Sequence, residues 1–297
     1  MTIFPTLKFI LAHPLNRRRQ LAAARDFLAW QIGSRLVPGA VAVPFVNGAR
    51  LLASPGMTGA TGNVYAGLHE FEDMAFALHL LRPEDLFVDV GANIGSYTVL
   101  AGAAAGARCA AFEPLPGTFQ HLLDNIRLNG LDGRVRAHNL GVGAAAGLRR
   151  FTAGLDTVNH VASTAEALAG GTVEVGVVTL DQALDGLSPK LVKIDVEGFE
   201  AEVIAGAGRV LADPELDAVI MELNGSGRRY GFDEVAIHRQ MLGHGFSTFA
   251  YAPFERALTA LGGTNPRAGN TLYVRNPGRV QARLADAPKF HVLGQDI

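Results

Sequence analysis

The chain is poor in cysteine, and this scarcity excludes two kinds of site. Its 297 residues include one cysteine, Cys109, so neither an internal disulfide nor a thiolate-bound metal cluster can form. A single thiol is typical of proteins in a reducing compartment, and we expect a cytoplasmic protein. Cys109 lies in the apolar run RCAAF, which indicates a buried structural thiol rather than a reactive one.

A surplus of one charge is also absent, with 26 basic against 28 acidic side chains. A net charge of -2 does not provide the basic surface that nucleic-acid binding needs, so we expect no such partner. No apolar run approaches the ~18 residues of a membrane-spanning helix. Arg17, Arg18 and Arg19 follow the short apolar run ILA, where a signal peptide would have a cleavage site. We expect the basic segment 15–36 in solvent or against the rest of the protein; docking on an anionic membrane is the alternative.

Strands and helices alternate along most of the chain, which is the pattern of a parallel sheet. It predicts an α/β fold with a doubly wound, mostly parallel, seven-stranded sheet of the Rossmann-like type. The expected strands are 86–90, 107–112, 134–140, 190–196, 217–223, 246–251 and 271–275, with a further strand outside this series in TVEVGVVTL.

Three regions are expected from these patterns. Residues 1–63 predict an extension of helix and β-hairpin, because Asn47-Gly48 in VAVPFVNGARLLA is a strong hairpin signal. Residues 64–276 form the expected main domain. Residues 277–297 form a tail without a clear signal.

The first expected strand ends in the glycine turn DVGANIG, residues 89–95. Doubly wound sheets bind ligands outside the carboxyl ends of their strands. Gly91 and Gly95 permit positive φ and close approach of a ligand to the backbone, although a simple tight turn would also use them. Glu113, in the motif FEP with Pro114, follows Asp89 by 24 residues at the end of the next strand. An acid at this spacing is placed to bind two ribose hydroxyls.

Two cofactors with a ribose fit this arrangement, NAD and S-adenosylmethionine. A dinucleotide requires G-x-G-x-x-G to hold its pyrophosphate at a helix N-terminus, whereas this turn has no glycine two positions after Gly91. S-adenosylmethionine has no phosphate and an amino acid end that Asp89 and the turn backbone can hold. We therefore favour S-adenosylmethionine, with a nicotinamide-dependent oxidoreductase as the alternative.

At this point the sequence resembles the FkbM-type methyltransferases, a branch of the class I S-adenosylmethionine-dependent enzymes that mostly methylate oxygen. The resemblance covers about residues 64–275 and is carried by DVGANIG, AFEP, KIDVEGFEAEVIAGA and VIMEL. It implies a functional cluster at Asp195, Glu197 and Gly198. Glu70 matches an acid in the family's lead-in to the first strand, where it could reach over the cofactor; a plain helix N-terminal acid is the alternative. The expected cofactor-binding residues are Glu70, Asp89, Gly91, Asn93, Gly95, Glu113, Pro114 and Asn139.

Asp195 and Glu197 lie two residues apart at a strand end, so both carboxylates point to the same side. Lys193, a divalent metal, a substrate hydroxyl or the cofactor could balance them. Their repulsion should raise one pKa and produce a general base. Our candidates in order are Asp195, Glu197, His160 and Glu222, where His160 is alternatively a surface histidine and Glu222 a buried acid paired with an arginine. We find no His/Cys metal spacing and assign no metal, with dependence through Asp195 or Glu197 left open.

The sequence therefore predicts an S-adenosylmethionine-dependent methyltransferase that O-methylates a hydroxyl of a sugar, glycan or small metabolite. A non-catalytic cofactor-binding module is a further alternative. Arg228, Arg229 and Tyr230 either recognise the acceptor or form a solvated loop, and residues 1–63 are the candidate interface of a homo-oligomer.

Overall fold

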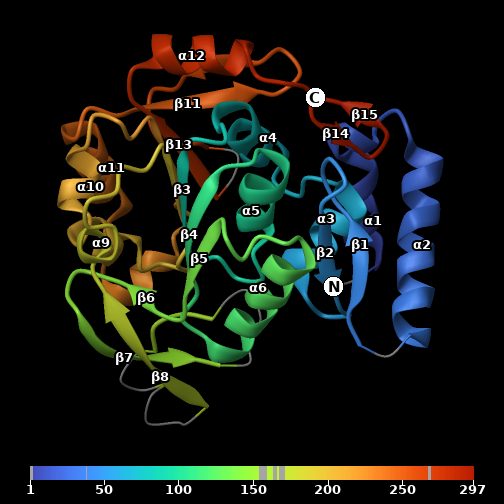
Figure 1. The fold of residues 1–297 in the computed structure, drawn as a ribbon, viewed down its shortest axis with the longest axis horizontal. Coiled ribbons are helices and arrows are strands. Elements are labelled where there is room, and N and C mark those ends of the chain that lie inside the picture. The colour runs from blue at the N-terminus through green and yellow to red at the C-terminus, as the bar shows by residue number, and fades with distance from the viewer. Residues whose placement is uncertain (1–2, 38, 154–158, 163–165, 167–170, 267–268) are drawn as a thin grey trace.

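A mixed sheet of eight strands forms the centre of the protein (Figure 1). The computed structural model describes residues 3–37, 39–153, 159–162, 166, 171–266 and 269–297. The strands of the central sheet are β3 (Leu86–Val90), β4 (Arg108–Phe112), β5 (Val135–His138), β9 (Leu191–Ile194), β10 (Ala218–Glu222), β11 (Ser247–Ala252), β12 (Ala257–Ala260) and β13 (Asn270–Val274).

The strand order is β12-β11-β13-β10-β9-β3-β4-β5. From β10 to β5 all neighbours are parallel, and β13, β11 and β12 add antiparallel pairs at one side. The chain moves outward from β3 to β5, then returns to β9 on the other side of β3, which makes the sheet doubly wound with its switch point between β3 and β9. The predicted α/β fold and its seven strands are confirmed. The eighth strand, β12, was not predicted because ALTA is short and only partly buried.

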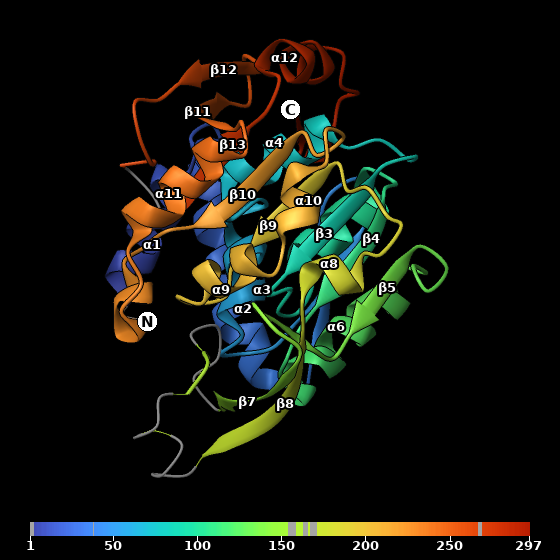
Figure 2. The ribbon, with the colours of Figure 1, turned by 90° about the vertical axis from the view of Figure 1, so that its left-hand side faces the viewer.

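Helices cover both faces of this sheet (Figures 1 and 2). A hydrophobic core lies on each face of the sheet, and alternate residues of a strand pack into opposite cores. Phe87 and Ile220 pack on one side, and Val88 and Val219 on the other, as expected where both faces are buried. The helices of the first side are α4 (Phe71–Leu80), α5 (Ser96–Val99) with its π-helical continuation η2 (Leu100–Ala104), and α6 (Pro116–Leu128). Those of the second are α8 (Leu180–Ala183), α9 (Glu200–Ala205), α10 (Gly208–Ala212) and α11 (Glu234–Gly243).

The N-terminal region packs beside α6. Its elements are α1 (Ile3–Ala12), η1 (Pro14–Asn16), α2 (Gln20–Leu36), β1 (Val41–Pro44), β2 (Arg50–Ala53) and α3 (Thr58–Ala66). The predicted hairpin is confirmed, with Val41 opposite Ala53. Side chains of α6 satisfy the free edge of β2, since Asn125 and Asn129 accept from the amides of Leu52 and Arg50 at 2.7 and 2.9 Å. This pairing ties the region to the main sheet.

Two smaller units complete the fold. A three-stranded sheet of β6 (Gly141–Val142), β7 (Gly147–Thr152) and β8 (Thr172–Val178) contains the predicted extra strand, and η4 (Ser226–Tyr230) lies near it. Residues 277–297, which had no clear sequence signal, form α12 (Pro277–Ala285) and the strands β14 (His291–Val292) and β15 (Gln295–Asp296). Across the part of the chain that the structure covers, no helix has the length and apolar character to span a membrane.

Candidate active site

A cavity of about 430 Å³ opens at the carboxyl ends of β3, β4, β9 and β10. This volume lies within the usual range of small-molecule sites, and its position is the switch point where doubly wound sheets bind ligands. Of the predicted residues it contains Glu70, Asp89, Gly91, Asn93, Glu113, Pro114, Asp195, Glu197 and Glu222.

Asp89 has an unsatisfied oxygen at the floor of this cavity. The Thr98 hydroxyl donates to its Oδ2 at 2.7 Å, but among the described residues nothing bonds to Oδ1, although the side chain is buried. Burial raises the pKa of Asp89, and the nearby Lys193 ammonium opposes that shift. Buried polar atoms are nearly always hydrogen-bonded, so a free buried acceptor facing a cavity fits a ligand with an ammonium or hydroxyl donor.

The glycine turn is shaped by protein neighbours. Gly91 and Gly95 have φ of 80° and 92°, where side chains are strained. A Cβ on Gly91 would lie 1.8 Å from the backbone oxygen of Asp195, and one on Gly95 would lie 2.5 Å from a methyl carbon of Leu122. We expected these glycines to let a ligand approach the backbone; in this structure they also leave room for the β9 end and for α6. Gly91 lines the cavity, while Gly95 lies outside its wall.

Glu113 is held in place by backbone amides. Its two oxygens accept from the amides of Asn93 and Leu115 at 3.0 and 2.9 Å, and burial raises its pKa to about 7. Asn139 does not line the cavity; its amide donates to the carbonyls of Glu113 and Pro114 at 2.9 Å each. The FEP segment is therefore clamped with the carboxyl group of Glu113 at the cavity wall.

Three acids converge beyond the glycine turn. Asp195, Glu197 and Glu222 can each place a carboxylate oxygen within 4.8 Å of the others, a geometry that a divalent cation could also use. Lys193 already supplies one positive charge, since its ammonium donates to Asp195 at 2.6 Å. Burial and the neighbouring acid Asp195 raise the pKa of Glu197 to about 6 and that of Glu222 to about 9. The predicted repulsion is thus present, and Glu222 carries a proton at neutral pH.

Glu70 joins this cluster from the start of α4. The Tyr97 hydroxyl donates to Glu70 at 2.6 Å, and the Lys193 ammonium lies 4.8 Å from the centre of the Tyr97 ring. Burial lowers the tendency of Lys193 to be charged, but Asp195, Glu70 and Asp89 together hold its pKa above the ordinary lysine value. The buried Lys193 ammonium therefore interacts favourably with several acids at once.

His160 does not line the cavity, although it is near enough to oppose the rise in the pKa of Glu197. Its ring nitrogen Nε2 lies 3.1 Å from Glu166, and its backbone amide donates to Thr152. Nearby, the Tyr230 hydroxyl donates to the backbone of Val161 at 2.6 Å. The structure thus brings Asp195, Glu197 and Glu222 together and leaves His160 in the neighbouring β7–β8 unit.

Sequence reasoning missed the part of the wall that α3 provides. Gly59 and Asn63 line the cavity, and Asn63 binds the hydroxyl of Ser96 and the amide of His69 at 3.2 and 2.9 Å. These residues lie outside the motifs, so no sequence signal pointed to them.

Fold and site together define the class: a doubly wound, Rossmann-like α/β protein with an acid-rich cavity at its switch point. The profile of the Methyltransferase FkbM domain matches residues 89–248, more than half of the chain. The chain belongs to this family of S-adenosylmethionine-dependent methyltransferases.

Two sequence relatives agree with this assignment. The chain is 32% identical to the 31-O-demethyl-FK506 methyltransferase FkbM of Streptomyces tacrolimicus, over 61% of this chain and 80% of that protein. It is 28% identical to the hexuronic acid methyltransferase AglP of Haloferax volcanii, over 48% of this chain and 56% of that protein. The chain thus spans little more than half the length of the Haloferax relative. A crystal structure of methyltransferase FkbM from Methylobacillus flagellatus KT aligns at a TM-score of 0.46 and 18% identity, over 72% of this chain and 52% of that one.

Proposed function

We propose that this protein transfers a methyl group from S-adenosylmethionine to a hydroxyl oxygen of a sugar, glycan or small metabolite. One observation carries the proposal: the same cavity holds a buried, unsatisfied acceptor at Asp89 and a cluster of acids with raised pKa at Glu197 and Glu222. The first suits a cofactor with donor groups, and the second suits removal of a proton from an acceptor.

Asp89, Glu113 and the turn between them fit the cofactor. Asp89 Oδ1 is available to a donor such as an ammonium group, and each Glu113 oxygen has a lone pair left beside its amide bond. Ribose hydroxyls are suitable donors for that acid. When bound, S-adenosylmethionine supplies a methyl group activated by its sulfonium, so the residues around it act mainly by positioning.

Glu197 is the best-suited general base of the three acids. A base is most effective when its pKa lies near the working pH, and the pKa of Glu197 is raised to about 6. Asp195 was our first candidate, but its bond to the Lys193 ammonium at 2.6 Å favours a role in orienting the acceptor. Glu222 can donate a hydrogen bond in its protonated form. The acceptor hydroxyl would then pass its proton to Glu197.

The acceptor class is supported by the relatives. One is named for hexuronic acid and the other for the 31-O position of demethylated FK506, so a sugar acid and an oxygen of a small metabolite are the first acceptors to try here.

Methyl transfer from labelled cofactor tests the proposal. Wild-type protein is incubated with hydroxyl-bearing sugars, cell-envelope glycans and small metabolites, and labelled product is counted. We expect label on at least one hydroxyl acceptor, with transfer reduced in Glu197→Gln. Cofactor binding without transfer to any acceptor would favour the non-catalytic module, and a fluorescence titration showing nicotinamide binding instead would favour the oxidoreductase.

A further inference from the structure

The outer face of α2 carries an apolar stripe without a partner in the described part of the chain. Its side chains are highly exposed: 91% for Leu21, 57% for Leu28, 60% for Ile32 and 75% for Leu36. At about 100° per residue, all four fall within an arc of about 80°. Phe27 and Trp30 cover the opposite face and are buried against the rest of the N-terminal region. The helix is therefore apolar on two faces, and packing within the chain explains only one.

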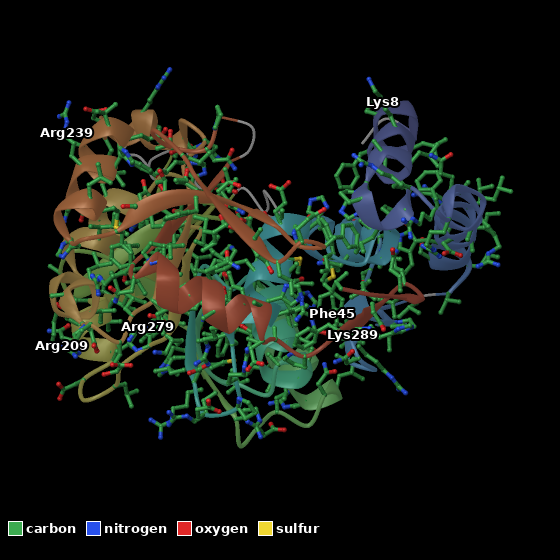
Figure 3. The ribbon with its side chains drawn as sticks, turned by 90° about the horizontal axis from the view of Figure 1, so that it is seen from above. Lys8, Phe45, Arg209, Arg239, Arg279 and Lys289 are labelled. Carbon is green, nitrogen blue, oxygen red and sulfur yellow. The ribbon has the colours of Figure 1, made fainter. Side chains whose placement is uncertain are left out.

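Cations surround this stripe. Arg17, Arg18, Arg25 and Arg35 are exposed on or just before α2. Arg25 pairs with Asp26, whereas no acid among the described residues forms an ion pair with Arg17, Arg18 or Arg35. Figure 3 shows α1 and α2 at one end of the molecule, with Lys8 projecting from α1.

The charge of this region differs from that of the rest of the chain. Residues 1–69 contain seven Lys or Arg residues and a single acid, Asp26, for a net charge of +6. The remaining residues carry -8, which gives the total of -2. A nearly neutral protein has thus concentrated its positive charge around one exposed apolar helix.

We propose that the outer face of α2, with Leu21, Leu28, Ile32 and Leu36, docks on an anionic membrane surface. Such a helix lies in the plane of the interface, with its apolar side chains among the acyl chains and its cations at the lipid headgroups. A second copy of the protein is a poorer occupant, because a two-fold contact through this face would bring the same arginines together. The inference is independent of the methyl-transfer proposal.

Vesicle flotation tests the docking. Wild-type protein is floated with phosphatidylcholine vesicles with and without phosphatidylglycerol, at low and high salt. We expect binding to the anionic vesicles alone, weakened by salt. Arg17→Ala with Arg18→Ala should reduce partitioning about 25-fold, and Leu28→Ser with Ile32→Ser at least about tenfold.

The control variant is Val235→Ser with Arg239→Ala. Both residues are exposed on α11, and Arg239 lies at the opposite end of the molecule from Lys8 (Figure 3), so its vesicle binding should equal that of wild type. Unchanged thermal unfolding would show that every variant is folded. Equal binding to neutral and anionic vesicles, or none to either, would overturn the proposal. So would a concentration-dependent dimer in sedimentation that the Leu28 and Ile32 changes abolish, because it would assign this face to a second copy.

Discussion

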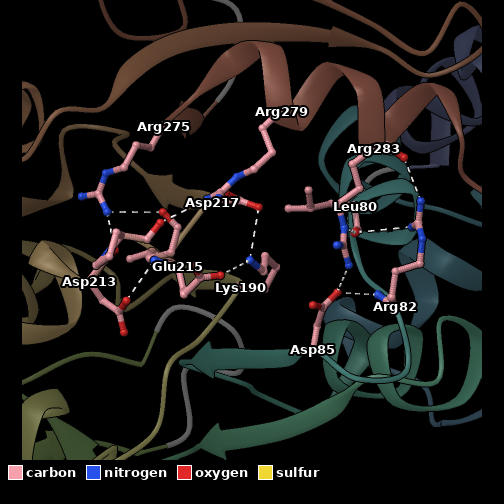
Figure 4. A network of polar contacts seen from close by, with 12 residues as sticks. Leu80, Arg82, Asp85, Lys190, Asp213, Glu215, Asp217, Arg275, Arg279 and Arg283 are labelled. Carbon is pink, nitrogen blue, oxygen red and sulfur yellow. Dashed lines mark hydrogen bonds and ion pairs between the residues drawn. The ribbon is translucent and has the colours of Figure 1, made fainter.

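The two edges of the central sheet handle charge in opposite ways. At the amino edge, where β3, β9 and β10 begin, acids and cations are paired (Figure 4). At the carboxyl edge, where the same strands end, Asp89 and Glu222 each have a buried oxygen without a hydrogen-bond partner among the described residues. Asp195 and Glu197 lie beside them, with Lys193 as the buried cation. The difference distinguishes a stabilising network from a site prepared for a ligand.

The amino-edge network clamps α12 to the sheet. Arg279 and Arg283 of α12 pair with Asp217 and Asp85, and Lys190 approaches Asp217 at 3.5 Å. Arg275 donates to backbone carbonyls, among them that of His244 at 2.7 Å. Each of these charged side chains has a partner among the described residues, which suits a role in holding the fold.

Changing Glu197 at the carboxyl edge should have the largest effect. Glu197→Gln removes the proposed base, so we expect the rate of methyl transfer to fall by about 10² to 10⁴-fold. Thermal stability should be unchanged or slightly raised, because the repulsion between the carboxylates of Glu197 and Asp195 is lost. The wild-type rate should rise with pH through about 6, where Glu197 loses its proton, and this rise should vanish in the variant. Steady-state kinetics between pH 5 and 8 would measure both.

The matched control is Glu255→Gln, at an exposed position away from the cavity. It should retain the wild-type rate and pH profile. A pH profile in Glu197→Gln that still rises near 6 would assign the base to another residue.

Changing the amino edge should reverse this pattern. Asp217→Ala leaves Lys190 and Arg279 without their buried partner, so we expect the free energy of unfolding to fall by about 3 kcal/mol, while cofactor affinity stays within about twofold. Glu215→Gln is the control, because it touches the same Lys190 from an exposed position and should cost less than about 1 kcal/mol. Urea unfolding measures both. Equal losses in the two variants would contradict a structural role for the buried pair.

The smallest expected effect is on stability at the carboxyl edge. The pKa of Glu222 is raised to about 9 by burial and by Asp195. The contribution of Glu222 to the free energy of unfolding is therefore fully present below the ordinary glutamate pKa and is lost as the pH rises toward 9. Glu222→Gln cannot ionise. Its Tm should match wild type near pH 4.5 and exceed it at pH 9 by about 2 °C or more. Calorimetric scans at the two pH values test this, and a Tm difference that does not grow with pH would contradict it.

Much of this contrast was accessible from sequence, because it depends on strand ends. The runs LFVDV, RCAAF and LVKI with their acids predicted the sheet, the switch point and the cluster at Asp195 and Glu197. Hydrophobic periodicity and turn residues suffice to predict such features, because each feature is encoded in a short segment of the chain.

Features that depend on distant segments were not accessible. The sequence did not show that Gly91 and Gly95 also leave room for Asp195 and Leu122, because these neighbours come from other elements. Likewise α3 brings Asn63 to the cavity through tertiary packing, and α12 lies in a stretch, residues 277–297, that has no recognisable motif. The sequence named Lys193 as a possible partner of the acids, but only the structure shows that its ammonium bonds to Asp195, on which the order of Asp195 and Glu197 as bases depends.

Calorimetric titration of wild type and Asp89→Asn with S-adenosylmethionine tests the central claim most directly. The unbonded Oδ1 of Asp89 is proposed to receive a donor of the cofactor, and a charged hydrogen bond of this kind contributes about 1.5–3 kcal/mol. We predict binding by wild type at one site and an affinity lower by about 10- to 100-fold in Asp89→Asn, with both proteins equally stable to heat. No binding by the wild type, or equal affinity in the two proteins, would contradict the assignment of the carboxyl edge as the cofactor site.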